Sequence, residues 1–252
     1  INQNAGIKSV KVDRELFQLI KRSVQVSKIT NGAFDISGTV ARDYWKITNQ
    51  ESAMPSPAII ARLRELINYK HILLDEDRQT VLLAKKGMKI GFGGIGKGYA
   101  ADKSKALLIL KGAQSGIINA SGDMNTWGKQ PNGNPWKVAI TNPMNKNKVF
   151  ALLPISNGAV VTSGNYEKYV NYNGKRYTHI IDPRTGYPSS GIISVTVFAP
   201  KAELADALAT SVFVMGIDAG LDRINQLDKI ECIIIDDKGH ITKSNNIIID
   251  KL

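Results

Sequence analysis

The sequence has little cysteine, little histidine and no long apolar run. Its single cysteine, Cys232, excludes an internal disulfide and a cysteine-based metal site. It lies in Glu-Cys-Ile-Ile-Ile, which favours a buried strand thiol. A membrane-spanning helix needs about 18 or more consecutive apolar residues, whereas the runs here are short, as at Ala159–Val161. Because 43% of the 252 residues are hydrophobic, we expect a globular fold with one large core or two modest ones.

Acidic residues are scarce relative to basic ones. The chain has 33 lysines and arginines against 22 aspartates and glutamates, a formal net charge of +11, so its surface should attract phosphates and other anions. The basic residues are scattered in small groups such as Lys85 with Lys86 and Lys175 with Arg176. No RNA-binding aromatic motif or zinc-ligand spacing accompanies them, so the sequence does not predict a nucleic-acid partner.

Apolar spacing predicts two helices in the first third of the chain. Asp13 is a suitable N-cap before apolar residues at helical spacing, and this helix should end near Thr30–Gly32. Ser56 followed by Pro57 predicts a second helix through Ile67, because the N–H that proline lacks would have no helical partner there. Three short strands of a meander should follow, at His71–Asp75, Thr80–Ala84 and Lys89–Phe92.

The rest of the chain is predicted to mix strands and helices. Trp136–Ala199 is typical of strands almost throughout, with Asn173-Gly174 as a two-residue hairpin turn. The remaining predicted helices are Lys97–Lys111, Lys201–Met215 and Ala219–Leu227, and the remaining strands are at residues 117–118, Ile230–Asp236 and Ile247–Asp250. With no repeat or long linker, we predict one compact α+β domain over residues 1–252, with mixed, mostly antiparallel sheets and flanking helices.

A glycine-rich segment, Gly91–Gly98, precedes one of the predicted helices. Such a segment can present backbone N–H groups to a phosphate at a helix N-terminus, and Lys97 adds a positive charge. It matches the dinucleotide-binding pattern G-x-G-x-x-G, but a meander precedes it where that motif requires a βαβ unit. It also begins like a P-loop, yet Gly98 stands where the metal-binding Ser or Thr belongs. A phosphate-binding loop and a plain glycine-rich turn both remain open.

Two further segments contain residues suited to catalysis. Asp206 and Thr210 are four residues apart, so a helix places both side-chain oxygens on one face, where they suit a hard cation such as Mg²⁺. A solvated face or a local side-chain hydrogen bond is the alternative. In His179–Gly186 a strand ends in an Asp-Pro turn, and His179 can orient or deprotonate a nucleophile. A structural strand histidine is the alternative.

The order of these segments resembles that of the ApbE-type FAD:protein FMN transferases. Two more glycine-containing turns, Thr30–Ser37 and Asn119–Asp123, each carry an acidic residue and fit the same order. The resemblance covers nearly the whole chain. Its motifs are Asn31-Gly-Ala-Phe-Asp35, Gly93-Gly-Ile-Gly-Lys-Gly-Tyr-Ala100, Thr162-Ser-Gly-Asn-Tyr166, His179 to Gly186 and Ala205-Asp-Ala-Leu-Ala-Thr210.

The resemblance implies an α+β core related to the T-fold and an enzyme that uses FAD as substrate and Mg²⁺ as cofactor. Members transfer the FMN half of FAD to a threonine hydroxyl of an acceptor protein and release AMP. By position, the metal contacts fall on Asp206, Thr210 and the main-chain oxygens of Gly94 and Ala209. The FAD contacts fall on Ala33, Phe34, Asp35, Lys97 and Ile181.

The implied reaction needs charge neutralisation on the phosphates and a base for the threonine hydroxyl. A metal at Asp206 and Thr210, together with Lys97, would provide the first. His179 is the first candidate for the base, with Asp206 or Asp182 as the second.

The resemblance also implies partners and a location. Typical acceptors are subunits of the sodium-pumping NADH:quinone reductase and of related membrane redox complexes. Members are often exported lipoproteins, so we expect a periplasmic protein or one at the outer face of the inner membrane, with any lipid anchor outside this chain.

Two departures from the family pattern stand out. Gly91 occupies a position where the family usually has an acidic FAD contact, and the family's upstream segment does not precede Ile1. We therefore keep a non-catalytic FAD-binding or scavenging protein, or an FAD pyrophosphatase, as alternatives.

Overall fold

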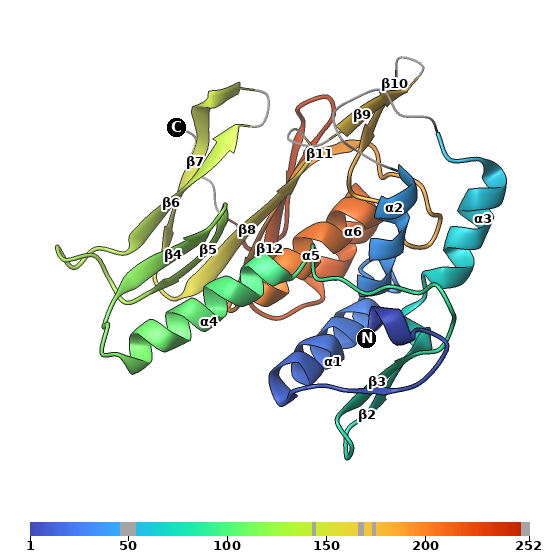
Figure 1. Ribbon diagram of the computed structural model, residues 1–252. Coiled ribbons are helices and arrows are strands. Elements are labelled where there is room, and N and C mark those ends of the chain that lie inside the picture. The colour runs from blue at the N-terminus through green and yellow to red at the C-terminus, as the bar shows by residue number, and fades with distance from the viewer. Residues whose placement is uncertain (46–53, 143–144, 166–168, 173–174, 248–252) are drawn as a thin grey trace. The chain divides into compact units, whose positions relative to one another are not determined.

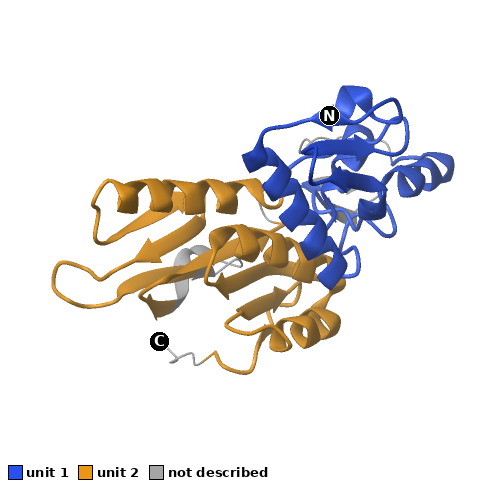
Figure 2. Cartoon of the chain, turned by 90° about the horizontal axis from the view of Figure 1, so that it is seen from below, with its two compact units in different colours: residues 1–93, 167–190 blue, residues 94–166, 191–252 orange. Residues whose placement is uncertain are grey.

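The computed structural model describes residues 1–45, 54–142, 145–165, 169–172 and 175–247 of the chain (Figure 1). The chain divides into two compact units, each built from two separate stretches of sequence (Figure 2). Unit 1 comprises residues 1–93 and 167–190, and unit 2 comprises residues 94–166 and 191–252. The range 1–252, predicted from the sequence as one domain, thus contains two units whose sequences interleave.

Unit 1 combines helices with two small antiparallel sheets. Its elements are α1 (Arg14–Ile29), α2 (Arg42–Trp45), α3 (Pro57–Leu66), β1 (Val10–Lys11), β2 (Ile72–Asp75), β3 (Thr80–Leu83), β9 (Tyr169–Tyr172) and β10 (Lys175–Thr178). One sheet has the order β1-β3-β2, and the other pairs β10 with β9. Side chains of Ile20, Leu63 and Val81 are almost fully buried, so α1, α3 and β3 all contribute to the core of this unit.

Both predicted N-terminal helices form, with the capping residues that the sequence indicates. Asp13 accepts a hydrogen bond from the N–H of Leu16 (2.8 Å) at the start of α1. Ser56 accepts one from the N–H of Ile59 (3.4 Å), and Pro57 is the first residue of α3. These caps satisfy N–H groups that have no partner inside a helix.

The predicted strand at Lys89–Phe92 is wrong, because this segment is a loop. The N–H and the carbonyl oxygen of Ile90 both bond to the side chain of Asn2 (2.9 and 3.1 Å). The N–H of Gly91 donates to the carbonyl oxygen of Ile36 (3.0 Å), which opens a 3₁₀ helix. The backbone groups of the segment are thus satisfied by a side chain and by a helix residue rather than by a neighbouring strand.

Unit 2 is built on a six-stranded antiparallel sheet with the order β13-β12-β11-β8-β5-β4. A hairpin of β6 and β7 packs on it: Ile140 forms a buried cluster with Ile233 and Ile247, and Leu153 and Phe198 pack against this cluster. The strands are β4 (Gly116–Ala120), β5 (Asp123–Trp127), β6 (Trp136–Asn142), β7 (Asn145–Ile155), β8 (Gly158–Gly164), β11 (Ile192–Ala199), β12 (Glu231–Asp236) and β13 (Ile241–Lys243).

Two long helices, α4 (Gly96–Leu110) and α5 (Ala202–Met215), lie side by side on this sheet, and a short helix, α6 (Ile217–Asn225), follows (Figure 1). Gly98 allows the first turns of α4 and α5 to touch, since a Cβ atom there would lie 2.1 Å from the carbonyl oxygen of Ala202. Asp102 of α4 caps α5, because its carboxylate accepts the N–H groups of Ala202 (2.9 Å) and Glu203 (3.0 Å). The glycine at the P-loop Ser/Thr position therefore serves helix packing.

Most other predicted elements form, with differences at two places. Strands β9 and β10 pair antiparallel on either side of the predicted Asn173-Gly174 turn, which lies outside the described residues. Of the predicted strand Ile247–Asp250, residues 248–250 also lie outside them, and Ile247 is not in a strand. The strand that pairs with β12 is instead β13, which the sequence analysis missed.

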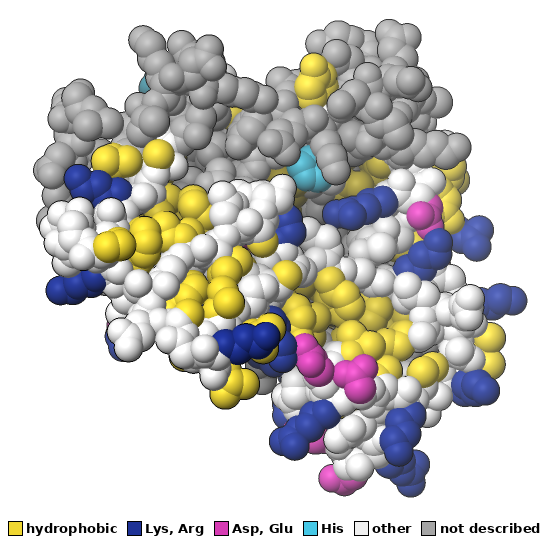
Figure 3. Space-filling model, turned by 60° about the vertical axis from the view of Figure 1, so that its left-hand side comes forward, with side chains coloured by type: hydrophobic (Ala, Val, Ile, Leu, Met, Phe, Trp, Pro, Cys, Tyr) yellow, Lys and Arg dark blue, Asp and Glu magenta, His cyan; other side chains and the backbone are white. Residues whose placement is uncertain are grey.

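The observed elements confirm the predicted α+β class with antiparallel sheets. Cys232 is fully buried in β12, as expected, and burial raises the pKa of its thiol to about 12. Lys and Arg side chains are spread over the face seen in Figure 3 rather than gathered in one stripe. Within the described ranges, no helix combines the length and apolar character needed to cross a membrane.

Candidate active site

The residues predicted to bind FAD and metal fall into two sets, one in each unit. Unit 1 contains Ala33, Phe34, Asp35, His179 and Ile181. Unit 2 contains Gly94, Lys97, Asp206, Ala209 and Thr210. Each set has a local geometry of its own.

The predicted metal residues of unit 2 centre on Asp206. This side chain is 3% exposed, and its Oδ2 atom accepts the N–H of Gly98 at 3.1 Å. Thr210 follows one turn later on α5 and is partly exposed, so the predicted common face exists. Gly94 lies in the loop before α4. Ala209 is fully buried within α5, where a helical carbonyl accepts the N–H four residues on, so Asp206, Thr210 and Gly94 are the better ligands.

A second buried carboxylate, Asp123, lies beside Asp206 and was not among the predicted site residues. Asp123 is fully buried, and its Oδ1 atom accepts a hydrogen bond from Nζ of Lys97 at 2.9 Å. Its Oδ2 atom is buried and has no hydrogen-bond partner within the described part of the chain. The predicted lysine is therefore held by a residue of the Asn119–Asp123 turn, to which the sequence analysis gave no site role.

The two carboxyl groups strongly influence each other's ionisation. Burial, and then the negative charge of Asp123, raise the pKa of Asp206 to about 7. Burial likewise raises the pKa of Asp123, although the ammonium of Lys97 acts in the opposite direction. Two like charges in a buried place cannot both ionise without a compensating cation.

This donor set fits a hard divalent cation. Carboxylate, hydroxyl and carbonyl oxygens are the ligands that Mg²⁺ takes, and the buried Oδ2 atom of Asp123 needs a partner. Across the residues that the structure describes, no cluster of three or more His, Cys, Asp or Glu side chains forms. Structural zinc sites use Cys and His ligands, whereas the donors here are oxygens.

The start of α4 adds a second feature suited to anionic ligands. Ile95, at the N-cap, makes no side-chain cap bond at the start of this 15-residue helix, although Asp206 accepts the N–H of Gly98, the third residue of the helix. A helix N-terminus carries partial positive charge, and Lys97 lies in its first turn. The glycine-rich segment thus has the features of a phosphate-binding helix start.

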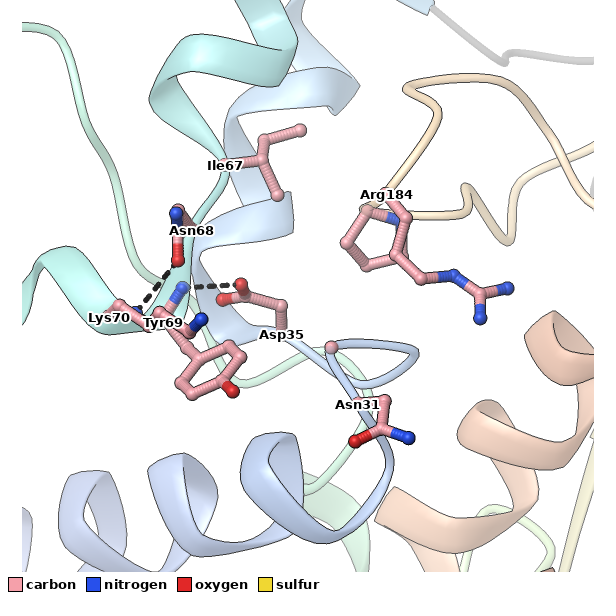
Figure 4. A pocket seen from close by; sticks show the side chains of 9 residues that line it. Asn31, Asp35, Ile67, Asn68, Tyr69, Lys70 and Arg184 are labelled. Carbon is pink, nitrogen blue, oxygen red and sulfur yellow. Dashed lines mark hydrogen bonds between the residues drawn. The ribbon is translucent and has the colours of Figure 1, made fainter.

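Unit 1 contains a cavity of about 320 Å³ beside Asp35 (Figure 4). In the close-up, Asn31, Tyr69 and Arg184 project around it from three different segments. The full lining is Asn31, Gly32, Asp35, Ile67, Asn68, Tyr69, Lys70, Pro183 and Arg184. A tyrosine ring, a guanidinium and several amide groups around one space suit a planar, polar ligand.

Asp35 is held rigidly at this cavity. Its Oδ1 atom accepts the N–H (2.8 Å) and hydroxyl (2.7 Å) of Ser37, and its Oδ2 atom accepts the N–H of Tyr69 (2.6 Å). Burial raises the pKa of Asp35, while these hydrogen bonds act in the opposite direction. Ala33 and Phe34 are almost fully buried and their N–H groups bond to Thr30, so they build the turn that positions Asp35.

The segment from His179 to Gly186 ends in a well-defined turn. Both carboxylate oxygens of Asp182 accept hydrogen bonds from the guanidinium of Arg184, at 2.9 and 3.0 Å. Ile181 forms an isolated antiparallel bridge with Pro188. His179 is partly exposed in unit 1, whereas Asp206 belongs to unit 2. Both carboxylate oxygens of Asp182 are thus engaged by Arg184, so His179 remains the first candidate for the base.

The departure at Gly91 has a local explanation. A Cβ atom at this position would lie 2.5 Å from the hydroxyl oxygen of Thr39, so a larger residue would have to displace that side chain. The position of the Thr39 side chain therefore favours glycine here. This position carries no carboxylate in place of the family's usual acidic residue.

Sequence reasoning missed Asp123 and the cavity residues Tyr69 and Arg184. The one available indication for Asp123 was its place at the exit of the Asn119–Asp123 turn, where Ser121 and Gly122 both have positive φ. Tyr69 and Arg184 lie far apart in sequence, so only the fold of unit 1 brings them to one cavity.

Buried carboxylates, a lysine at a helix start and an antiparallel α+β fold together suit the binding of a phosphorylated ligand. The ApbE family model matches residues 1–234 of the chain. An FAD:protein FMN transferase of Klebsiella pneumoniae (strain 342) is 32% identical over 251 residues, which are 99% of this chain and 76% of that protein. The chain belongs to the ApbE family.

Solved structures agree with this assignment. The ApbE protein of Thermotoga maritima MSB8 has 33% identity and a TM-score of 0.89, with 97% of this chain and 80% of that one covered. The apo flavinyl transferase ApbE of Pseudomonas stutzeri has 27% identity and a TM-score of 0.84, covering 96% and 76%. The predicted family, fold class and enzyme class, a flavin transferase, are confirmed.

Proposed function

We propose that this enzyme transfers the FMN half of FAD to a threonine hydroxyl of an acceptor protein, in a Mg²⁺-dependent reaction that releases AMP. The observation that carries the proposal is the buried pair of Asp123 and Asp206 with Lys97 at the start of α4. It is supported by relatives named FAD:protein FMN transferase.

The proposed reaction is a phosphoryl-type transfer at the pyrophosphate of FAD. The threonine oxygen forms a new bond to the FMN phosphorus while its proton passes to a base. The bond from that phosphorus to the bridging oxygen breaks, and AMP leaves with the electron pair. Such transfers need positioning and charge neutralisation more than covalent help.

The residues of unit 2 would bind the pyrophosphate region. Asp206, Thr210 and the carbonyl oxygen of Gly94 would hold Mg²⁺, which supplies neutralisation of phosphate charge when bound. Lys97 is 47% exposed at its side chain and carries an ammonium that can reach a phosphate oxygen outside the protein core. Its contact with Asp123 fixes where that charge sits before substrate arrives.

His179 would accept the proton of the threonine hydroxyl. The alternative Asp182 is engaged by Arg184, and Asp206 would be occupied by the cation. A neutral imidazole is the side chain best matched to proton transfer near neutral pH.

The cavity of unit 1 would take part of the flavin nucleotide. Tyr69 offers a ring for stacking, and Asp35 fixes the backbone of Tyr69 at the cavity wall. The identity of the acceptor is a further proposal, drawn from the family resemblance: a subunit of a membrane redox complex such as the sodium-pumping NADH:quinone reductase. A location in the periplasm or at the outer face of the inner membrane follows from the same resemblance.

The test is an incubation of the protein with FAD, Mg²⁺ and a threonine-bearing acceptor domain from such a reductase subunit. Chromatography and mass spectrometry would quantify AMP, free FMN and FMN bound to the acceptor. We expect AMP and acceptor-bound FMN in equal amounts, and no product with EDTA or with Asp206→Asn. An acceptor in which alanine replaces the threonine is the matched control.

Other product patterns would contradict the proposal. Equal amounts of AMP and free FMN, with an unmodified acceptor, would indicate an FAD pyrophosphatase. Retention of intact FAD without AMP would indicate a binding or scavenging protein. Full transfer in EDTA would remove the role assigned to Mg²⁺.

A further inference from the structure

Asp123 is placed at the site by the turn between β4 and β5. The side chain of Asn119 accepts the N–H of Gly122 at 2.8 Å, and the next residue, Asp123, is the first of β5. Alternation along a strand puts Asp123 and Asn125 on the same face of the sheet. Asn125 accepts a hydrogen bond from Lys105 of α4 (2.9 Å), so this face is the one that α4 covers.

The two oxygens of Asp123 are in different situations. Oδ1 is bound by Lys97 at 2.9 Å, which fixes the plane of the carboxylate. Oδ2 is buried, and when both Asp123 and Asp206 are ionised it has no hydrogen-bond partner within the described part of the chain; a proton shared between the two carboxyl groups would be the alternative contact. A buried carboxylate oxygen without a partner is costly, and native proteins rarely leave one unless a ligand or an ion supplies the contact.

The charge balance indicates what that contact is. Asp123 and Asp206 bring two negative charges into a place where they are 0% and 3% exposed. Lys97, which bonds to Asp123, brings one positive charge, and its side chain is 47% exposed. The remaining negative charge favours a cation over an anion, and the oxygen donors of the site favour a hard divalent cation such as Mg²⁺.

We propose that Asp123 is a ligand of the divalent cation, through Oδ2, beside Asp206. The inference rests on the proposed function, because it assigns a further residue to the same cation. Lys97 then has two effects: it offers a charge to the substrate and, through Oδ1, it orients the carboxylate that binds the metal. The carboxylate of Asp123 would thereby contact both the ammonium of Lys97 and the cation.

The rival explanation is that Asp123 only positions Lys97. The two explanations predict different effects of Asp123→Asn on metal affinity once Lys97→Met has removed the lysine. A metal ligand loses affinity for the cation when changed to asparagine, whether or not Lys97 is present. A residue that only holds Lys97 has no further effect on metal affinity once the lysine is gone.

The experiment measures binding of Mg²⁺ alone by its effect on the melting temperature, and of Mn²⁺ by electron paramagnetic resonance, with no FAD present. The variants are Asp123→Asn, Asp123→Ser, Lys97→Met and Lys97→Met with Asp123→Asn. Asp237→Asn is the matched control, because it removes the same charge from an exposed turn of unit 2.

We expect both Asp123 variants to bind Mg²⁺ and Mn²⁺ at least about 10-fold more weakly than the parent, in either lysine background. In EDTA, the same variants should melt at or above the parent's temperature, because a buried like charge has been removed, and this also shows that they fold. Asp237→Asn should bind like the parent.

Parent-like affinity for Mn²⁺ in Asp123→Asn would overturn the inference while leaving the proposed function intact. Loss of affinity only when Lys97 is present would overturn it in favour of lysine positioning. If the parent itself bound neither Mg²⁺ nor Mn²⁺, the Mg²⁺ dependence of the proposed function would fail as well.

Discussion

At the scale of single residues, the site is governed by two carboxylates in one buried place. Asp206 accepts a backbone N–H and Asp123 accepts an ammonium, yet both remain close enough to oppose each other's ionisation. The two carboxylates therefore form an unfavourable charge contact that a bound cation would relieve. Stability should depend on pH for this reason, and so would the affinity for the proposed cation.

The first prediction concerns the stability of the protein in EDTA. The pKa of Asp206 is raised from 3.8 to about 7 in the folded protein, so between these values the folded state holds a proton that the unfolded chain has lost. The relative stabilisation is complete below the unfolded pKa and is lost as the pH rises through about 7. We expect the melting temperature to fall over this range, and to fall less steeply in Asp206→Asn.

Saturating Mg²⁺ is the control for this prediction, because the cation replaces the proton and should remove the difference in slope. Equal slopes for the parent and Asp206→Asn in EDTA would contradict the raised pKa of Asp206.

The second prediction concerns Lys97. Lys97→Met should weaken FAD binding about 10- to 100-fold, since a hydrogen bond to a charged group contributes about 1.5–3 kcal/mol. Fluorescence titration measures the change. Lys111→Met, which removes the same charge just beyond the other end of α4, should bind FAD like the parent. Unchanged affinity in Lys97→Met would mean that the glycine-rich segment is only a turn.

The third prediction concerns His179. His179→Gln keeps hydrogen-bonding capacity but cannot take a proton at neutral pH, so FMN transfer should fall about 10²- to 10⁴-fold. FAD affinity and melting temperature should change little. His240→Gln, on the surface of unit 2, is the control. Transfer within a few-fold of the parent, together with a lowered melting temperature, would make His179 a structural residue.

At the scale of elements, the contact between α4 and α5 positions the carboxylates and the lysine. Asp102 joins the two helices by capping α5, and Gly98 lets their first turns meet. Because Gly98 also donates its N–H to Asp206, any shift of α4 moves the backbone donor of the site as well. Gly98 therefore serves both the packing of α4 against α5 and the hydrogen bonding of Asp206.

The fourth prediction tests this contact. Gly98→Ala should destabilise the protein by about 1–3 kcal/mol, because the added methyl would overlap the carbonyl of Ala202 and α4 must move. Urea unfolding measures the loss. Ser104→Ala on the exposed part of α4 should leave stability within about 0.5 kcal/mol. A stability equal to the parent's in Gly98→Ala would show that the two helix starts do not need this close approach.

Elements marked by local chemistry could be predicted from the sequence. Asp13 and Ser56-Pro57 are caps that act within one helical turn, so both helices were found at almost their true bounds. Lys89–Phe92 was mistaken for a strand because of its alternating apolar residues. That alternation cannot reveal that the distant side chain of Asn2 forms the hydrogen bonds of the Ile90 backbone. The three-residue strand β13 is too short to give a pattern.

At the scale of the whole molecule, the candidate site depends on pairs that lie far apart in sequence. Lys97 and Asp123 are 26 residues apart, and Gly98 and Asp206 are 108 apart. The family resemblance assigned a site role to Lys97 and Asp206 but not to their partners Asp123 and Gly98, since local patterns do not encode which turn meets which helix. The assignments of Asp206, Thr210 and Lys97 therefore came from motif, whereas Asp123 needed the fold.

The interleaving of the two units has a consequence for synthesis on the ribosome. Unit 1 opens with the first residues to emerge, but β9, β10 and the His179 segment arrive only after most of the strands of unit 2 have been made. A chain interrupted after Gly93 would lack part of unit 1, and the remainder would carry that part inside unit 2. Neither unit can therefore be translated as one continuous piece, and co-translational folding should finish late, after β11 and β12 have left the exit tunnel.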